Sequence, residues 1–210
     1  MAKKLLILLM TILIVSCNDS KTQKTSDALD EVESNERKDN TNNPVDENSS
    51  NTSNLNGVDF SAEVKNFITC KKAATERNDC RNSITKIITK TYDLTEFNDP
   101  KLGYVVYDSI RPIVERSREW LQLGSINQET INQALAHTNR GGLSLIIDTA
   151  NTYGHVVMII PGETKKSGSW AMKLPNVLSL TNYKPEKSFY NKSLSYAMQK
   201  SDDLKIFLRQ

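Results

Sequence analysis

Histidine and cysteine are scarce in this chain, which has two and three of them among its 210 residues. So few histidines, and cysteines whose spacing matches no zinc signature, argue against a metal centre built from these side chains. The sequence also has no glycine-rich loop of the kind that cradles phosphate groups. Beyond the first fifteen residues it has no apolar run long enough to cross a membrane. We therefore expect neither a metal ion nor another cofactor.

The amino terminus has the features of an export signal. Lys3 and Lys4 give it a positive start, and Leu5 to Val15 is apolar except for one threonine. This run is too short to span a bilayer, and the small residue Ser16 and then Cys17 follow it. Ile14-Val15-Ser16-Cys17 resembles the lipobox of bacterial lipoproteins, which implies that residues 1–17 are a signal peptide ending at a lipidated Cys17. An ordinary signal peptide with a chance cysteine, or a membrane anchor, would explain the same residues.

Residues 18–57 have the composition of a disordered acidic tether. They contain nine acidic and four basic side chains, no aromatic residue and very few large apolar ones. Such a segment cannot bury enough apolar surface to offset its conformational entropy. We expect it to act as an extended spacer between an anchor on a bacterial membrane and the rest of the chain.

Residues 58–210 have the length of one domain, and their apolar periodicity changes along the way. Helical spacing predicts helices at 60–68, 80–90, 109–123 and from Ser125 to before Gly141, with Asn78 or Asp79 capping the second and a Ser125–Gln128 capping box on the fourth. After Gly142, β-branched and apolar runs predict strands at 143–147, 155–160, 169–174, 193–198 and 204–208. Helices followed by strands predict an α+β fold, with N-terminal helices packed on a C-terminal antiparallel β-sheet.

The domain carries a modest excess of positive charge, with 21 basic and 16 acidic side chains. This charge suits a polyanionic surrounding such as the cell wall, although nucleic acid would fit the sign equally well. A mildly basic domain without any charged partner is a further alternative. We expect peptidoglycan or a peptide as partner, and no nucleic acid.

Cys80 and His155 are the two residues with a local setting suited to catalysis. Cys80 is expected in the first turn of an amphipathic helix, where the helix dipole favours a thiolate over a thiol. His155 follows Gly154 at the expected start of a buried strand, which would hold the ring rigidly. A base on a strand end that faces a cysteine at a helix start is the arrangement required for nucleophilic catalysis.

A wider set of motifs resembles the NlpC-type cysteine peptidases and amidases, including the CHAP group. The resemblance covers about residues 79–209, and its most specific part is Gly154-His155-Val156-Val157-Met158-Ile159-Ile160-Pro161-Gly162. It implies a papain-like domain that hydrolyses amide bonds, commonly in peptidoglycan peptides, with Cys80 as nucleophile and His155 as base. Arg81-Asn82-Ser83 departs from the apolar residues that usually follow the family's cysteine.

The third polar residue of such a site, which orients the histidine, is not marked by a motif. If strands 155–160 and 169–174 form a hairpin that turns near Lys165, the residue opposite His155 falls near Pro175 or Asn176. Asn176 could then hold the imidazole through its side-chain carbonyl. It could equally be a turn residue beside Pro175.

Cys70 provides an alternative to catalysis. With Cys17 lipidated, an exported domain would hold only Cys70 and Cys80, and an even pair in an oxidising compartment is normally a disulfide. An oxidised Cys80 cannot attack a substrate. Two free thiols therefore favour a cell-envelope cysteine amidase or peptidase, whereas a Cys70–Cys80 disulfide favours a non-catalytic, lipid-anchored binding module.

Overall fold

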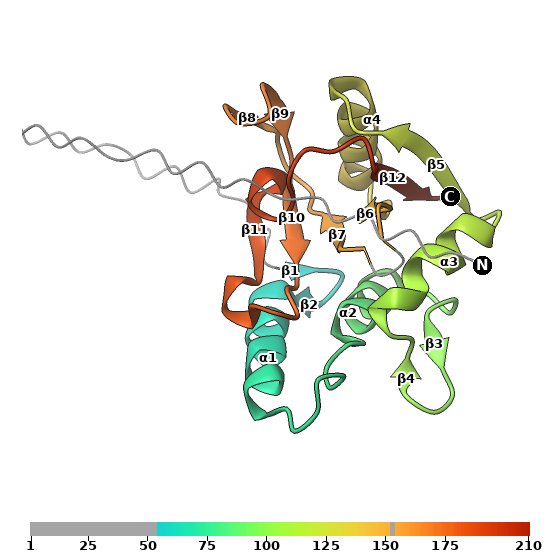
Figure 1. The fold of residues 1–210 in the computed structure, drawn as a ribbon. Coiled ribbons are helices and arrows are strands. Elements are labelled where there is room, and N and C mark those ends of the chain that lie inside the picture. Colours follow the sequence, from blue (N-terminus) through green and yellow to red (C-terminus); the bar gives the residue numbers. More distant parts are fainter. Residues whose placement is uncertain (1–53, 152–153) are drawn as a thin grey trace, which may run out of the picture. The chain divides into compact units, whose positions relative to one another are not determined.

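The computed structural model describes residues 54–151 and 154–210 (Figure 1). The predicted signal, its lipidated Cys17 and residues 18–53 of the predicted tether lie outside the described residues. Residues 54–57, which the sequence assigns to that tether, belong instead to a small hairpin of β1 (Asn54–Leu55) and β2 (Val58–Asp59). Its Asn-Gly turn has positive φ at both residues, 50° and 81°, as tight hairpin turns require. No helix among the described residues combines the length and the apolar character that a membrane span needs.

The described residues form a mixed α+β domain with four α-helices and a six-stranded antiparallel sheet, in agreement with the predicted α+β class. The sheet has the strand order β11-β10-β7-β6-β12-β5, and all of its neighbouring strands are antiparallel. The helices are α1 (Phe60–Ala73), α2 (Ser83–Tyr92), α3 (Ile110–Arg116) and α4 (Gln128–Asn139). The strands of the sheet are β5 (Trp120–Ser125), β6 (Ser144–Asp148), β7 (Val156–Ile159), β10 (Asn176–Ser179), β11 (Phe189–Ser193) and β12 (Leu204–Arg209). Two further hairpins pair β3 (Asn98–Asp99) with β4 (Gly103–Tyr104) and β8 (Lys165–Ser167) with β9 (Met172–Leu174).

The central strands of the sheet are buried on both faces. Leu145 and Met158 point into a core that contains side chains of α1, α2 and α3, whereas Ile146 and Val157 point into a second core that contains side chains of α4. In Figure 1, α1 and α2 lie on one side of the sheet and α4 lies on the other. Burial on both faces explains why the central strands are continuously apolar rather than alternating with polar residues.

Two of the predicted elements are wrong over part of their length. The predicted helix at 109–123 ends at Arg116, and its last residues belong to β5, an edge strand paired with β12. Pairing with β12 decides the conformation of this segment, since apolar residues at 120 and 121 fit either a helix or a strand. The predicted strand at 193–198 is largely a 3₁₀ turn over Leu194–Tyr196, which follows the end of β11.

Two predicted helix starts also differ from the structure. Helix α2 begins at Ser83, with Asn82 at its N-cap, so Cys80 precedes the helix instead of lying in its first turn. The capping box of α4 is formed by Asn127 and Thr130 rather than by Ser125 and Gln128. The β-strand continues through Ser125, which makes this serine part of the sheet.

Candidate functional site

Cys80 and His155 line the same pocket, as the predicted pairing requires. The pocket has a volume of ≈ 550 Å³ and lies between the segment that precedes α2 and one end of the sheet. Arg81 and Tyr107 line it on the cysteine side, and Asp148 lines it beside the histidine. The remaining wall comes from residues 180–183 and 197–201. The fold thus brings two residues that are far apart in sequence to one concave site.

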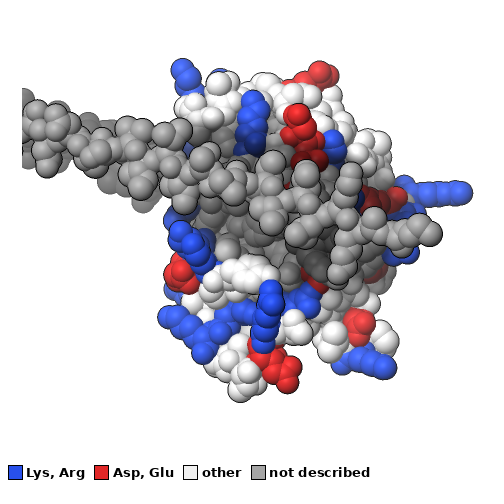
Figure 2. Space-filling view, in the orientation of Figure 1, with Lys and Arg blue, Asp and Glu red and all other residues white. Residues whose placement is uncertain are grey.

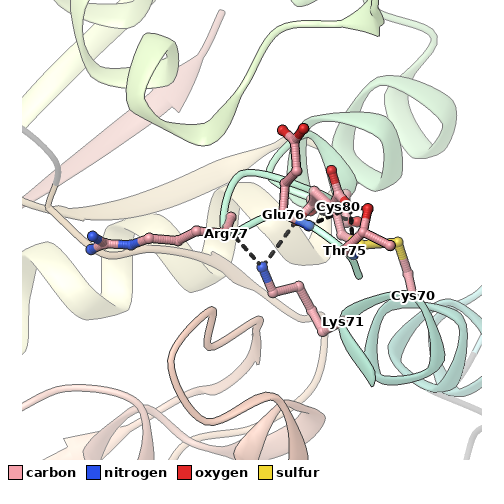
Figure 3. Close-up of a disulfide and its surroundings, with 8 residues drawn as sticks. Cys70, Lys71, Thr75, Glu76, Arg77 and Cys80 are labelled. Carbon is pink, nitrogen blue, oxygen red and sulfur yellow. Dashed lines mark hydrogen bonds between the residues drawn. A yellow bond between two sulfur atoms is a disulfide. The ribbon is translucent and has the colours of Figure 1, made fainter. Parts of the chain in front are cut away.

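Cys80 is covalently bound to Cys70 in this structure (Figure 3). The two Cα atoms are 6.2 Å apart, and the bond joins the last turn of α1 to the residue at the pocket. The Cys70 residue is exposed, whereas Cys80 is half-buried against the core formed with α1 and α2. This is the pairing that the sequence analysis gave as the alternative to catalysis. In this oxidised form Cys80 cannot act as a nucleophile.

The loop between the two cysteines has its own set of hydrogen bonds. The Asp79 carboxylate accepts hydrogen bonds from the backbone N–H groups of Thr75 and Glu76, at 3.1 and 3.2 Å. Lys71 Nζ donates to the carbonyl oxygens of Arg77 and Asp79, at 3.3 and 3.0 Å (Figure 3). These polar contacts define the conformation of the loop without using either sulfur atom.

Cys80 has a left-handed backbone conformation, with φ of 64°. Its carbonyl oxygen accepts hydrogen bonds from the backbone N–H and the hydroxyl of Ser83, at 3.2 and 2.9 Å. A non-glycine residue in this region costs roughly 1–2 kcal/mol, and such residues are found preferentially at functional sites. The expected contribution of the α2 dipole to this thiol is reduced, because Cys80 lies before the helix instead of inside its first turn.

His155 immediately precedes β7, where the chain passes close to Asp148 at the end of β6. Its carbonyl oxygen accepts a hydrogen bond from the N–H of Asp148 at 2.9 Å. Gly154 lies directly against the Asp148 carbonyl, so a Cβ atom at position 154 would collide with that oxygen. Burial lowers the pKa of His155 below its ordinary value of 6.5, and the nearby Asp148 carboxylate opposes this effect in part. The imidazole is therefore neutral at neutral pH, the form that can accept a proton.

Ser179 holds one nitrogen of the imidazole. Its Oγ lies 2.8 Å from His155 Nε2, and the serine is fully buried. On β10, Ser179 pairs with Val157 of β7, which places it diagonally across from His155. Among the described residues, no hydrogen-bond partner is found for His155 Nδ1. No sequence motif marks Ser179, because its place beside His155 depends on the register between β7 and β10.

Asn176 does not lie opposite His155, so the predicted hairpin register is wrong. The segment 165–174 forms its own hairpin of β8 and β9, and the partner of β7 is β10. Asn176 lies at the opposite end of this pairing, where its carbonyl oxygen accepts from the N–H of Ile160 at 3.0 Å. Its side-chain amide donates to Asn191 at 2.6 Å. The histidine-orienting position predicted for Asn176 is occupied by Ser179.

Two arginine–tyrosine pairs lie at the pocket, where Arg81, Tyr107 and Tyr183 line the wall and Arg77 lies outside it. The Arg81 guanidinium lies 5.1 Å from the centre of the Tyr107 ring and forms an ion pair with Asp108. The Arg77 guanidinium lies 5.4 Å from the centre of the Tyr183 ring and donates to its hydroxyl at 2.7 Å. On the uncovered part of the face drawn in Figure 2, basic and acidic side chains are interspersed. The wall around Cys80 thus combines aromatic rings with cationic groups.

Among residues 54–151 and 154–210, no three His, Cys, Asp or Glu side chains lie together in a way that could hold a metal ion. Neither a family model nor a curated protein matches this chain. The resemblance to NlpC-type enzymes therefore rests on the motifs of residues 79–209.

Proposed function

We propose that this domain is a cysteine amidase or peptidase that is active when Cys80 is reduced. The disulfide-bonded chain described above would then be its inactive form. The observation that supports this proposal best is the shared pocket of Cys80 and His155, in which Ser179 binds one nitrogen of the imidazole. A nucleophile, a base and a group that orients the base are the elements of a thiol hydrolase.

In this proposal each of these residues has a role in catalysis. With the proton on Nε2, His155 donates to the Ser179 hydroxyl, and Nδ1 is free to accept the proton of the Cys80 thiol. The Cys80 thiolate attacks the amide carbonyl, and the backbone N–H of Cys80 helps to bind the developing oxyanion. His155 then returns the proton to the leaving amine, and water hydrolyses the thioester.

The architecture and the amino terminus extend this proposal. Helices α1 to α3 precede the first strand of the sheet, Cys80 lies just before α2, and His155 lies just before β7, an order that suits a papain-like domain. The sequence of residues 1–17 indicates lipidation at Cys17, so we place the enzyme on a bacterial membrane, facing the periplasm or the exterior. Peptidoglycan peptides are the amide substrates that such a location offers.

A second candidate function is favoured by the disulfide itself. A bond between Cys70 and Cys80 fits a non-catalytic module that binds envelope peptides in the same pocket and is stabilised by a permanent crosslink. In this alternative, His155 and Ser179 are polar groups of a binding site and transfer no proton.

Hydrolysis of peptidoglycan fragments by the full chain, with and without a dithiol reductant, separates the two functions. We expect new amine groups to appear only after reduction, with activity abolished by either Cys80→Ala or His155→Ala. The double variant should be little worse than either single one, since the two residues act as a unit. His137→Ala is the matched control, because His137 lies on α4 and not in this pocket. Binding of the fragments without any hydrolysis by the reduced protein would establish the binding module instead.

A further inference from the structure

The two cysteines of the disulfide lie in different environments. Cys70 is an exposed residue in the last turn of α1. Cys80 is half-buried, packs against the core and lines the pocket beside His155. Thiol–disulfide exchange depends on which sulfur the attacking thiolate can reach. The more exposed of the two residues is therefore the cysteine that has no role in the proposed mechanism.

We propose that the Cys70–Cys80 disulfide is a reversible latch on the nucleophile, opened by a dithiol reductant that attacks Cys70. The effect of opening the latch, which is the release of a Cys80 able to act as nucleophile, rests on the proposed function. The exchange reaction itself depends only on the exposure of the two cysteines and on the loop between them.

Opening of the latch is a two-electron reduction in two steps. A thiolate of the reductant attacks Cys70 Sγ, the Cys70–Cys80 bond breaks, and Cys80 leaves as a thiolate into the pocket. The second thiol of the reductant then attacks the mixed disulfide, so that Cys70 is released as a thiolate and the reductant becomes a disulfide. Protons from solvent balance the charge. Attack on Cys70 thus delivers Cys80 directly in its nucleophilic form.

The loop between the cysteines makes this step reversible. Asp79 caps the loop through Thr75 and Glu76, and Lys71 binds two of its carbonyl oxygens. Because these contacts use no sulfur, the loop keeps its conformation after reduction, and the two thiols remain close together. Reduction then changes the chemistry of the pocket and leaves the contact between Arg77 and the pocket residue Tyr183 in place. A crosslink that only stabilised the fold would need no such independent support.

The first test identifies the sulfur that is attacked. The full oxidised chain is treated under native conditions with glutathione, quenched with acid and digested, and the mixed disulfides are located by mass spectrometry. We expect the adduct on Cys70 to exceed that on Cys80 by more than about tenfold. A predominant adduct on Cys80, or a disulfide that is reduced only after the protein unfolds, would overturn the latch.

The second test measures closure of the latch. The reduced chain is reoxidised with glutathione disulfide, and free thiols are counted over time. We expect Asp79→Ala to re-form the Cys70–Cys80 bond several times more slowly, because the loop loses the acceptor of the Thr75 and Glu76 N–H groups. Asp202→Ala is the control, since Asp202 is exposed and lies outside this loop. Equal rates for Asp79→Ala and the unmodified chain would contradict a preorganised loop.

Failure of the latch and failure of the proposed function give different results. Cys70→Ser should hydrolyse peptidoglycan fragments without any reductant, because Cys80 then has no cysteine partner in the domain. If the adduct forms on Cys70 but neither Cys70→Ser nor the reduced chain hydrolyses an amide, the enzyme proposal fails and the redox couple remains. If the reduced chain hydrolyses amides but the adduct forms on Cys80, the enzyme proposal holds and the latch fails.

Discussion

The hydroxyl of Ser179 is the partner through which the sheet orients His155. We predict that Ser179→Ala lowers kcat of the reduced enzyme by about tenfold, with little change in KM, because the imidazole loses its orientation but remains able to accept a proton. The acidic side of the pH–rate profile for amide hydrolysis should also shift, because His155 Nε2 loses its hydrogen bond to the Ser179 hydroxyl.

Two variants serve as controls for Ser179→Ala. Ser144→Ala removes another fully buried hydroxyl of the same sheet, one that bonds Thr138 and the carbonyl oxygen of Ala134 far from the histidine. Asn176→Ala removes the residue that the sequence predicted for this role. Neither should change kcat, and a comparable loss in both would mean that Ser179 contributes only to the stability of the sheet.

The depressed pKa of His155 predicts a contribution to stability that depends on pH. Desolvation disfavours the charged ring in the folded chain, and Asp148 opposes this effect only in part. A group whose pKa is lower when folded stabilises the fold above its unfolded pKa of about 6.5, and this contribution is lost as the pH falls through the folded pKa. Urea titrations of the oxidised chain should therefore show a falling free energy of unfolding below about pH 6.5.

His155→Gln provides the comparison for this pH effect. The variant keeps a polar side chain but cannot be protonated in this range, so its free energy of unfolding should fall less steeply between pH 7 and pH 5. If the free energy of unfolding falls equally steeply with pH in both proteins, the pKa of His155 in the folded chain is not depressed.

At the scale of elements, the turn from β6 to β7 determines where His155 lies. Gly154 is in direct contact with the Asp148 carbonyl, so Gly154→Ala forces the two strands apart beside the pocket. We predict a loss of roughly 1–3 kcal/mol of stability, the range typical of overpacking, together with reduced amide hydrolysis. Thermal unfolding gives the first quantity. Gly168→Ala is the control, because an added Cβ there meets no atom within 4 Å, and it should leave both properties unchanged.

The central strands could be predicted because their own residues determine them. The runs near 143–147, 155–160 and 204–208 are apolar and β-branched, and they form β6, β7 and β12 close to the predicted bounds. The segment near Trp120 could not be predicted, because its conformation depends on a partner strand more than eighty residues away.

The same distinction applies to the site. Local patterns identified Cys80 and His155, which do line one pocket, whereas the residue that orients the histidine depended on strand register. Asn176 was predicted from a hairpin that the chain does not form, and Ser179 took its place. The sequence also left the state of Cys80 open between a free thiol and a disulfide. The structure has the disulfide, the outcome that favours the binding module in the oxidised chain.

At the scale of the whole molecule, the predicted anchor requires its own test. Cys17→Ser should release the protein from bacterial membranes or block its maturation, since stable anchoring depends on the acyl chains. Membrane fractionation and the mass of the mature protein measure these two effects. The lipoprotein prediction is wrong if the variant stays in the membrane fraction at the mature size of the parent. Cys70→Ser controls for the loss of a cysteine elsewhere and should stay with the membrane.

The order of strands in the sheet has a consequence for how the domain is made. Strand β12 comes after every other strand in the sequence, yet it lies inside the sheet, between β6 and β5. As the chain emerges from a ribosome or an export channel, β6, β7, β10 and β11 can pair as they appear, whereas β5 must wait for β12. Closure of long chain loops is slow, so this step is expected to limit folding. Until it occurs, the strand edges of β5 and β6 are unpaired and open to pairing with other chains.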